Sequence, residues 1–167
     1  LAIGWMRKAA ELGHAVAQNT LANILGGARA SAEEKSESMI WRQKAAEQGH
    51  ASAQSSLGTA YRYGDGLPKD SIEATKWYEK AAQQGDAGGQ FGLAMSYAMG
   101  DGVPRDDRLA LEWAQKAAKT GNQVAQFYMG LVYADGLLGV TKNMEAVMTW
   151  WQKSADQGLT DAMLKLS

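Results

Sequence analysis

The chain has 167 residues, a formal net charge of −1, 46% hydrophobic residues and 21% charged residues, which is the composition of a folded globular protein rather than a disordered one. The 17 basic residues are scattered along the sequence, so the basic stripe that a nucleic-acid-binding surface needs is missing. The absence of cysteine excludes a disulfide framework and a thiolate metal site, and the absence of an 18-residue apolar run argues against a membrane-spanning helix.

A nine-residue motif that begins with Trp and ends with Gly occurs five times. The copy at residues 77–85 reads Trp-Tyr-Glu-Lys-Ala-Ala-Gln-Gln-Gly, and related copies occupy residues 5–13, 41–49, 113–121 and 150–158. The five Trp residues are spaced by 36, 36, 36 and 37 positions. A fixed period of this size predicts an all-α solenoid, in which antiparallel helix pairs stack into an α/α superhelix.

The period divides the chain into four complete units and two incomplete ones. We expect units at residues 13–48, 49–84, 85–120 and 121–157, preceded by the end of a second helix (1–12) and followed by part of a first helix (158–167). Each unit starts at a Gly that ends the preceding helix in a left-handed conformation. The next residue, which is His14, His50, Asp86, Asn122 or Leu159, is expected to start the first helix of the unit.

Apolar residues at helical spacing predict which face of each helix is buried. The first helix carries the pattern Ala-Gln-x-x-Leu-Gly-x-x-Tyr, and the second carries the Trp motif. A loop of the type Gly-Asp-Gly-x-Pro-x-Asp joins them and precedes a helix start, where a missing amide hydrogen is tolerated. Asp70 with Glu73, and Ser31 with Glu34, have capping-box spacing. The predicted repeat core consists of Trp41, Trp77, Trp113, Trp150, Leu57, Leu93, Tyr61, Tyr97 and Tyr133.

These motifs resemble the Sel-one-like repeat (SLR) family, which is related to tetratricopeptide repeats. The resemblance covers the whole chain and implies a superhelix of helix pairs that acts as an adaptor or scaffold protein. Family members include bacterial secreted or periplasmic proteins and eukaryotic membrane-protein quality-control components. The resemblance therefore favours a bacterial, periplasmic or secreted protein, while the sequence itself leaves the compartment open. Some bacterial members have paired cysteines in each unit, and this chain has none.

Three groups of residues invite a chemical function and are better explained by structure. Asp65 and Asp101 lie in Gly-Asp-Gly loops, but the further carboxylates and the closing Glu of a calcium loop are missing, so turn formation is favoured. His14 and His50 occupy equivalent positions 36 residues apart, which favours a helix-start role over a metal ligand or a general base. No Ser, His and acidic set departs from the repeat as a triad would. We expect no metal, no cofactor and no enzymatic activity.

One stripe of residues breaks the repeat on the face opposite the predicted core. The positions one and five after the repeated Gln are polar in the first two units, where they read Asn19, Asn23, Ser55 and Thr59. In the next two units they become apolar, as Phe91, Met95, Phe127 and Leu131, and Met99 extends the stripe by one turn. An exposed apolar stripe indicates a contact surface. The alternative is that the stripe packs against the adjacent unit.

The stripe leads to a specific functional hypothesis. Phe91, Met95, Met99, Phe127 and Leu131 are predicted to form the floor of a partner-binding groove, with Arg62 and Tyr63 at its more polar edge. The favoured function is a scaffold that binds a protein or peptide segment on its concave face. The alternative is a structural assembly piece without its own groove, which oligomerises through its repeat ends. Helical-repeat RNA binding is disfavoured by the apolar stripe and the net charge.

Overall fold

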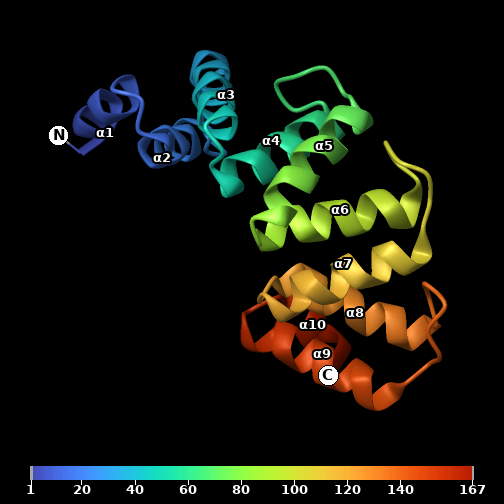
Figure 1. Cartoon of the computed structure of the whole chain (residues 1–167). Helices are drawn as coiled ribbons and strands as arrows, with labels where there is room; N and C mark the ends of the chain where they lie inside the picture. Colours follow the sequence, from blue (N-terminus) through green and yellow to red (C-terminus); the bar gives the residue numbers. More distant parts are fainter. Residues whose placement is uncertain (1, 167) are drawn as a thin grey trace.

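The computed structural model describes residues 2–166, and this part of the chain forms ten α-helices and no strand (Figure 1). The helices are α1 (Ala2–Glu11), α2 (Ala15–Leu25), α3 (Ala32–Glu47), α4 (Ala51–Tyr63), α5 (Ser71–Gln83), α6 (Ala87–Met99), α7 (Asp107–Lys119), α8 (Gln123–Asp135), α9 (Met144–Asp156) and α10 (Thr160–Leu166). The predicted all-α class is therefore confirmed. Residues 1 and 167, which the predicted incomplete units include, lie outside the described residues.

The helices follow one another along a curved array, with the two ends of the chain at opposite ends of it (Figure 1). The even-numbered helices are the first helices of the predicted units, and the odd-numbered helices are the second helices. The main contacts join consecutive helices, and the first helices α4 and α6 also contact each other. Each unit thus buries its surface against its sequence neighbours, as expected for a solenoid.

Polar side chains start the helices at the predicted positions. The side chains of Asp86 and Asn122 accept hydrogen bonds from the amides three residues on, and His50 does the same through Nδ1 at 3.3 Å. His14 also occupies the helix-start position, without a side-chain cap. The predicted helix-start role of the two histidines is thus confirmed. Each bond satisfies an amide that has no partner within the helix.

Of the two predicted capping boxes, the one at Asp70 and Glu73 forms only one of its two hydrogen bonds. Ser31 and Glu34 form the complete box, in which each side chain accepts a hydrogen bond from the other residue's amide. Asp70 accepts from the Glu73 amide, but the Glu73 carboxylate forms an ion pair with Lys76 at 3.1 Å. The Ser31 box starts α3 early, so that α3 has 16 residues whereas α5 has 13.

A glycine with positive φ follows each second helix. At Gly85, for example, φ is +82°, and a Cβ built there would meet no atom within 4 Å. The left-handed backbone, and not a lack of space, therefore requires glycine at this position. The following residue starts the next helix at once, which keeps the two helices in a tight antiparallel turn.

A buried glutamine joins three helices of successive units. The Nε2 of Gln54 in α4 donates to the carbonyl of Ala46 near the end of α3 at 3.1 Å, and its Oε1 accepts from Gln84 after α5 at 2.8 Å. The same pair of bonds recurs at Gln18 and Gln126, and Gln90 accepts from Thr120. All four glutamines are buried. Buried amides need such partners, so the bonds fix the register between units.

The repeated Trp residues lie at the edge of the core. Trp41 is buried, whereas Trp77, Trp113 and Trp150 are half-buried, and all three contact the buried clusters at one side. The lysine three residues later covers the ring in all five copies, at distances from 3.9 Å for Lys80 over Trp77 to 4.9 Å for Lys8 over Trp5. The Trp-x-x-Lys spacing of the motif therefore reflects a cation–π contact across one helical turn.

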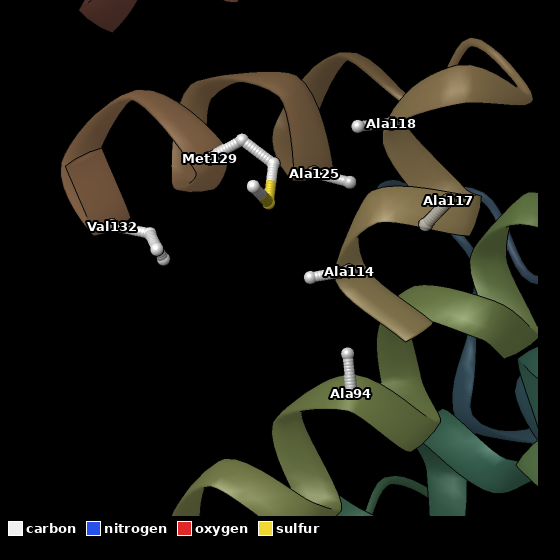
Figure 2. Packing of buried hydrophobic residues seen from close by; sticks show 7 residues of the cluster. All are labelled: Ala94, Ala114, Ala117, Ala118, Ala125, Met129 and Val132. Atoms are coloured by element: carbon white, nitrogen blue, oxygen red, sulfur yellow. The ribbon is translucent and has the colours of Figure 1, made fainter. Parts of the chain in front are cut away.

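The buried centre of the array consists mainly of small side chains. Leu57 and Leu93 are buried, whereas Tyr61, Tyr97 and Tyr133 are half-buried against the same clusters. Figure 2 shows Ala94 of α6 opposite Ala114 of α7, with Met129 and Val132 of α8 closing the same cluster. Because alanine occupies many of the helix contacts, the helices approach closely there, and the repeated Tyr side chains lie at the edges of these clusters.

Replacing Gln54 with Met tests the glutamine bonds. Methionine keeps the volume but leaves the Ala46 carbonyl and the Gln84 amide without their partner, so we expect a loss of about 2–4 kcal/mol in the free energy of unfolding. Urea unfolding monitored by circular dichroism measures the loss. The control is Gln83→Met, at the exposed residue before Gln84, which takes no part in these bonds and should cost less than about 1 kcal/mol. Equal costs for the two variants would mean that the buried amide has no special role.

Truncating the repeated Trp residues tests their placement. We expect Trp77→Ala to cost about 2–3 kcal/mol, which is below the range for a fully buried Trp, because Trp77 is half-buried. Trp5 is 69% exposed, so Trp5→Ala should cost less than about 1 kcal/mol. Thermal and urea unfolding of both variants provide the comparison, and equal losses would contradict the placement of the two side chains.

Candidate partner-binding groove

A cavity of about 530 Å³ lies between the first helices α4 and α6, with α5 beneath it. Its lining residues are Thr59, Arg62, Tyr63, Lys69, Tyr78, Gly88, Phe91, Gly92, Met95, Met99 and Asp101. We call this cavity the α4–α6 groove. Five of the seven residues predicted for the groove thus line one cavity, and its volume lies within the range of small-molecule and cofactor pockets.

Phe91, Met95 and Met99 form the apolar side of the groove. They are four residues apart on α6, so they lie along one face of the helix. Phe91 and Met95 are half-buried, and Met99 is 62% exposed. The thioether side chains can adapt to an irregular partner surface, which makes this face suitable for contact.

The ring of Tyr78 forms the floor of the groove because glycine faces it on both sides. A Cβ on Gly92 of α6 would lie 2.4 Å from the ring, and a Cβ on Gly58 of α4 would lie 2.8 Å from it. The Tyr78 hydroxyl donates to Thr59 Oγ1 at 3.2 Å. Burial raises the pKa of the Tyr78 phenol, and the bond to Thr59 only partly opposes this effect. The two glycines therefore admit the ring between α4 and α6.

Charged side chains lie at one end of the groove. Arg62 is buried, its Nη2 donates to the sulfur of Met99 at 3.1 Å, and the same nitrogen lies 3.9 Å from Asp101 Oδ2. Its guanidinium also lies 6.0 Å from the ring of Tyr63. Lys69 lies in the adjoining loop and is exposed. One carboxylate thus faces two cations, which leaves this end of the groove positive.

Phe127 and Leu131 lie in the next unit and are not among the lining residues of the groove. Both are half-buried. The ring of Phe127 stacks on Trp151 with centroids 6.1 Å apart, and the Trp151 indole donates to the Phe127 carbonyl at 3.2 Å. Phe127 thus packs within its own unit, whereas Phe91 contacts the next unit, edge-to-face with Tyr128 at 5.8 Å. The predicted stripe therefore combines groove residues with packing contacts within and between units.

The sequence interpretation missed Tyr78 and the glycines that admit it. The signal was present at two variable positions of the repeat. The residue after the repeated Trp varies between units and is Met6, Arg42, Tyr78, Ala114 or Trp151. In the two complete units where it is aromatic, the facing residue of the first helix is glycine, namely Gly58 opposite Tyr78 and Gly130 opposite Trp151. A large residue opposite glycine marks a close contact between helices, and this pairing becomes visible once the two helices are known to face each other.

The described residues give no indication of a metal centre or a membrane span. Residues 2–166 contain no group of three or more His, Asp or Glu side chains arranged to hold a metal ion. Within the same range, none of the helices combines the length and the hydropathy required to cross a bilayer.

The fold and the groove define the class of this protein as a helical-repeat solenoid with an apolar groove between successive first helices. The chain belongs to the Sel1 repeat family, because the Sel1 repeat profile matches residues 1–14, 16–50, 51–86, 87–122 and 123–159. The resemblance inferred from the motifs is thereby confirmed. Sel1 repeat proteins are generally protein-interaction scaffolds.

Solved bacterial structures share this architecture. A protective antigen of uropathogenic Escherichia coli with an SLR fold, c5321, is 33% identical over 98% of this chain, with a TM-score of 0.83. A Sel1 repeat protein from Oxalobacter formigenes is 34% identical over 92% of this chain, with a TM-score of 0.81. Cysteine-rich protein B of Helicobacter pylori is 25% identical, with a TM-score of 0.57, over 74% of this chain and 89% of its own.

This chain spans only part of the two more similar relatives, namely 35% of the E. coli protein and 61% of the O. formigenes protein. None of the curated proteins matches this sequence.

Replacing Gly92 with Ala tests the contact that forms the groove floor. Alanine favours a helix by about 1 kcal/mol over glycine, but its methyl group would overlap the Tyr78 ring, so we expect a net loss of about 1–3 kcal/mol. The control is Gly4→Ala in α1, where a Cβ meets nothing within 4 Å and a small gain in stability is expected. Combining Gly92→Ala with Tyr78→Ala should remove the penalty, and an additive double variant would contradict the contact.

Proposed function

We propose that this chain is a protein-interaction scaffold that binds an extended or helical peptide segment in the α4–α6 groove. The observation that carries the proposal is the apolar side of the groove. Phe91 and Met95 occupy repeat positions that hold polar residues in the first two units, and together with Met99 they line a cavity large enough for several side chains. A repeat protein gains specificity at such variable positions because its framework positions are fixed by packing.

The groove fits a segment with apolar side chains at its centre and a polar or acidic end. The apolar side chains would lie on Phe91, Met95 and Met99, where removal of water provides most of the affinity. The polar end would lie near Arg62 and Lys69, whose two positive charges face the single carboxylate of Asp101. This direction of binding follows from the charged groups, which all lie at one end of the groove.

A second candidate function rests on a different observation. Apolar side chains are exposed at both ends of the array, among them Trp5, Leu12 and Val16 at one end and Met163 at the other. Association of one end with the other in a second copy would bury them in a head-to-tail interface. This structural assembly role predicts concentration-dependent association in analytical ultracentrifugation, which substitution of Leu12 and Val16 with Ser would abolish.

The two phenylalanines of the chain provide a matched test of the groove. Peptides selected from a random display library on the wild-type protein serve as probes, and their affinity is measured by fluorescence polarisation. We expect Phe91→Ser to weaken binding by about 30-fold or more, as for a central contact residue. Phe127→Ser should bind within about threefold of the wild type, because that ring stacks on Trp151 outside the groove.

Met99→Ser provides the same test with less risk to the fold, because Met99 is exposed. Its control is Met148→Ser, an exposed methionine on α9 that does not line the groove. We expect at least tenfold weaker binding for the first variant and no change for the second. Equal binding by both variants would place the binding surface elsewhere on the array.

A further inference from the structure

A second, smaller cavity of about 150 Å³ lies one unit before the groove. It lies between the loop after α2, the helix α3 and the loop after α4, and its lining residues are Gly26, Gly27, Ala28, Lys35, Ser38, Met39, Arg42, Asp65 and Gly66. We call it the Arg42 pocket. Its volume corresponds to about five water molecules at ~30 Å³ each, so it admits a small ion or chemical group and not a peptide.

The Arg42 pocket is the repeat counterpart of the α4–α6 groove. Four lining residues of the pocket are Gly26, Gly27, Arg42 and Asp65. The residues 36 positions later, which are Arg62, Tyr63, Tyr78 and Asp101, line the groove. In this earlier unit, the two large side chains at the end of the first helix are replaced by glycine. The ring of Tyr78 is replaced by the guanidinium of Arg42. The same place on the second helix thus holds an aromatic ring in one unit and a guanidinium in the unit before it.

The guanidinium of Arg42 is held at the wall of this pocket without a matching anion. A Cβ on Gly26 would lie 3.5 Å from Arg42 Nη2, which places the end of the side chain beside the lining glycine. The Nε is buried and has no hydrogen-bond partner among residues 2–166. Burial lowers the pKa of Arg42, and the charge of Asp65 only partly opposes this effect. A half-buried cation without a bonded partner is costly, and an anion would relieve that cost.

The other charged groups of the pocket leave it positive. Lys35 and Arg42 are its cations and Asp65 is its only carboxylate. Within the described part of the chain, neither cation forms an ion pair with a carboxylate at 4.0 Å or less. The nearby Glu34 is already engaged in the capping box with Ser31. A Cβ on Gly26 would lie 2.7 Å from Ser38 Oγ, so a side chain at this position cannot fill the space without displacing Ser38.

We propose that the Arg42 pocket binds a phosphate group, either as free phosphate or as a phosphate monoester, with Arg42 and Lys35 as its cationic ligands. A phosphate group carries a charge of about −1.5 to −2 at neutral pH. Two cations match this charge more closely than they match the single negative charge of a carboxylate. The guanidinium offers a planar set of donors that suits phosphate oxygens, and Lys35 adds a point charge. Asp65 opposes the anion and limits its affinity.

Thermal unfolding with inorganic phosphate as the probe tests the pocket. We expect sodium phosphate to raise the Tm of the wild-type protein relative to sodium chloride at equal ionic strength, because a ligand of the native state stabilises it. Arg42→Met should abolish this rise, and its Tm in chloride should equal or exceed that of the wild type, since an apolar residue replaces a half-buried charge without a bonded partner. The control Arg29→Met, an exposed arginine in the same loop, should keep the full response.

Calorimetric titration with phosphate gives the matching affinities. We expect at least tenfold weaker binding for Arg42→Met and several-fold weaker binding for Lys35→Met, whose exposed position does not endanger the fold. Asp65→Asn should strengthen binding, because it removes the opposing charge. If Asp65 is instead the true partner of Arg42, Asp65→Asn and Arg42→Met will both lower the Tm in chloride, and the proposal is overturned.

Two further titrations identify the source of the phosphate group. Binding of both O-phosphoserine and inorganic phosphate is the result expected for a pocket open to monoesters, and binding of inorganic phosphate alone assigns the pocket to the free anion. Acetate should bind at least tenfold more weakly than either. Acetate binding as tight as phosphate binding would overturn the phosphate assignment in favour of a simple carboxylate site.

Discussion

A buried glutamine side chain that bonds to two second helices determines how successive units stack. Gln54 receives a hydrogen bond from Gln84 and donates one to the Ala46 carbonyl, so that one amide spans the boundary between two units. The two bonds are 3.1 Å and 2.8 Å long, and the Gln54 amide that makes them is buried. These bonds join α4 to α3 and to the residue that follows α5, the helix beneath the groove.

With the register fixed, the size of a few side chains determines what lies between neighbouring helices. Gly58 and Gly92 admit the Tyr78 ring, and Gly130 admits the Trp151 indole. Where both facing residues are alanine, as at Ala94 and Ala114, the helices meet directly (Figure 2). The framework thus stays constant while these positions vary, and the groove and the Arg42 pocket are two results of variation at the same place.

This variation explains how one repeat can present different chemistry along a single surface. In the first unit, glycines at the helix end and Arg42 on the facing helix form a small cationic pocket. One unit later, Arg62, Tyr63 and Tyr78 at the corresponding positions form a wide groove with an apolar side. The sites are adjacent in the array, so a single partner with an anionic group and an apolar segment could contact both.

The sequence by itself determined the period, the helix pairs, the helix starts at His50, Asp86 and Asn122, and the glycine turns. These features depend on bonds and backbone angles within a few residues, which a local pattern reveals. Only the tertiary structure decided that Trp77 lies at the edge of the core under Lys80, that Phe127 stacks on Trp151, and that Arg42 is half-buried beside Gly26. Periodicity shows which face of a helix points inward, but the contacts that a side chain makes also depend on residues of other helices, whose sizes and charges a single helical pattern does not contain.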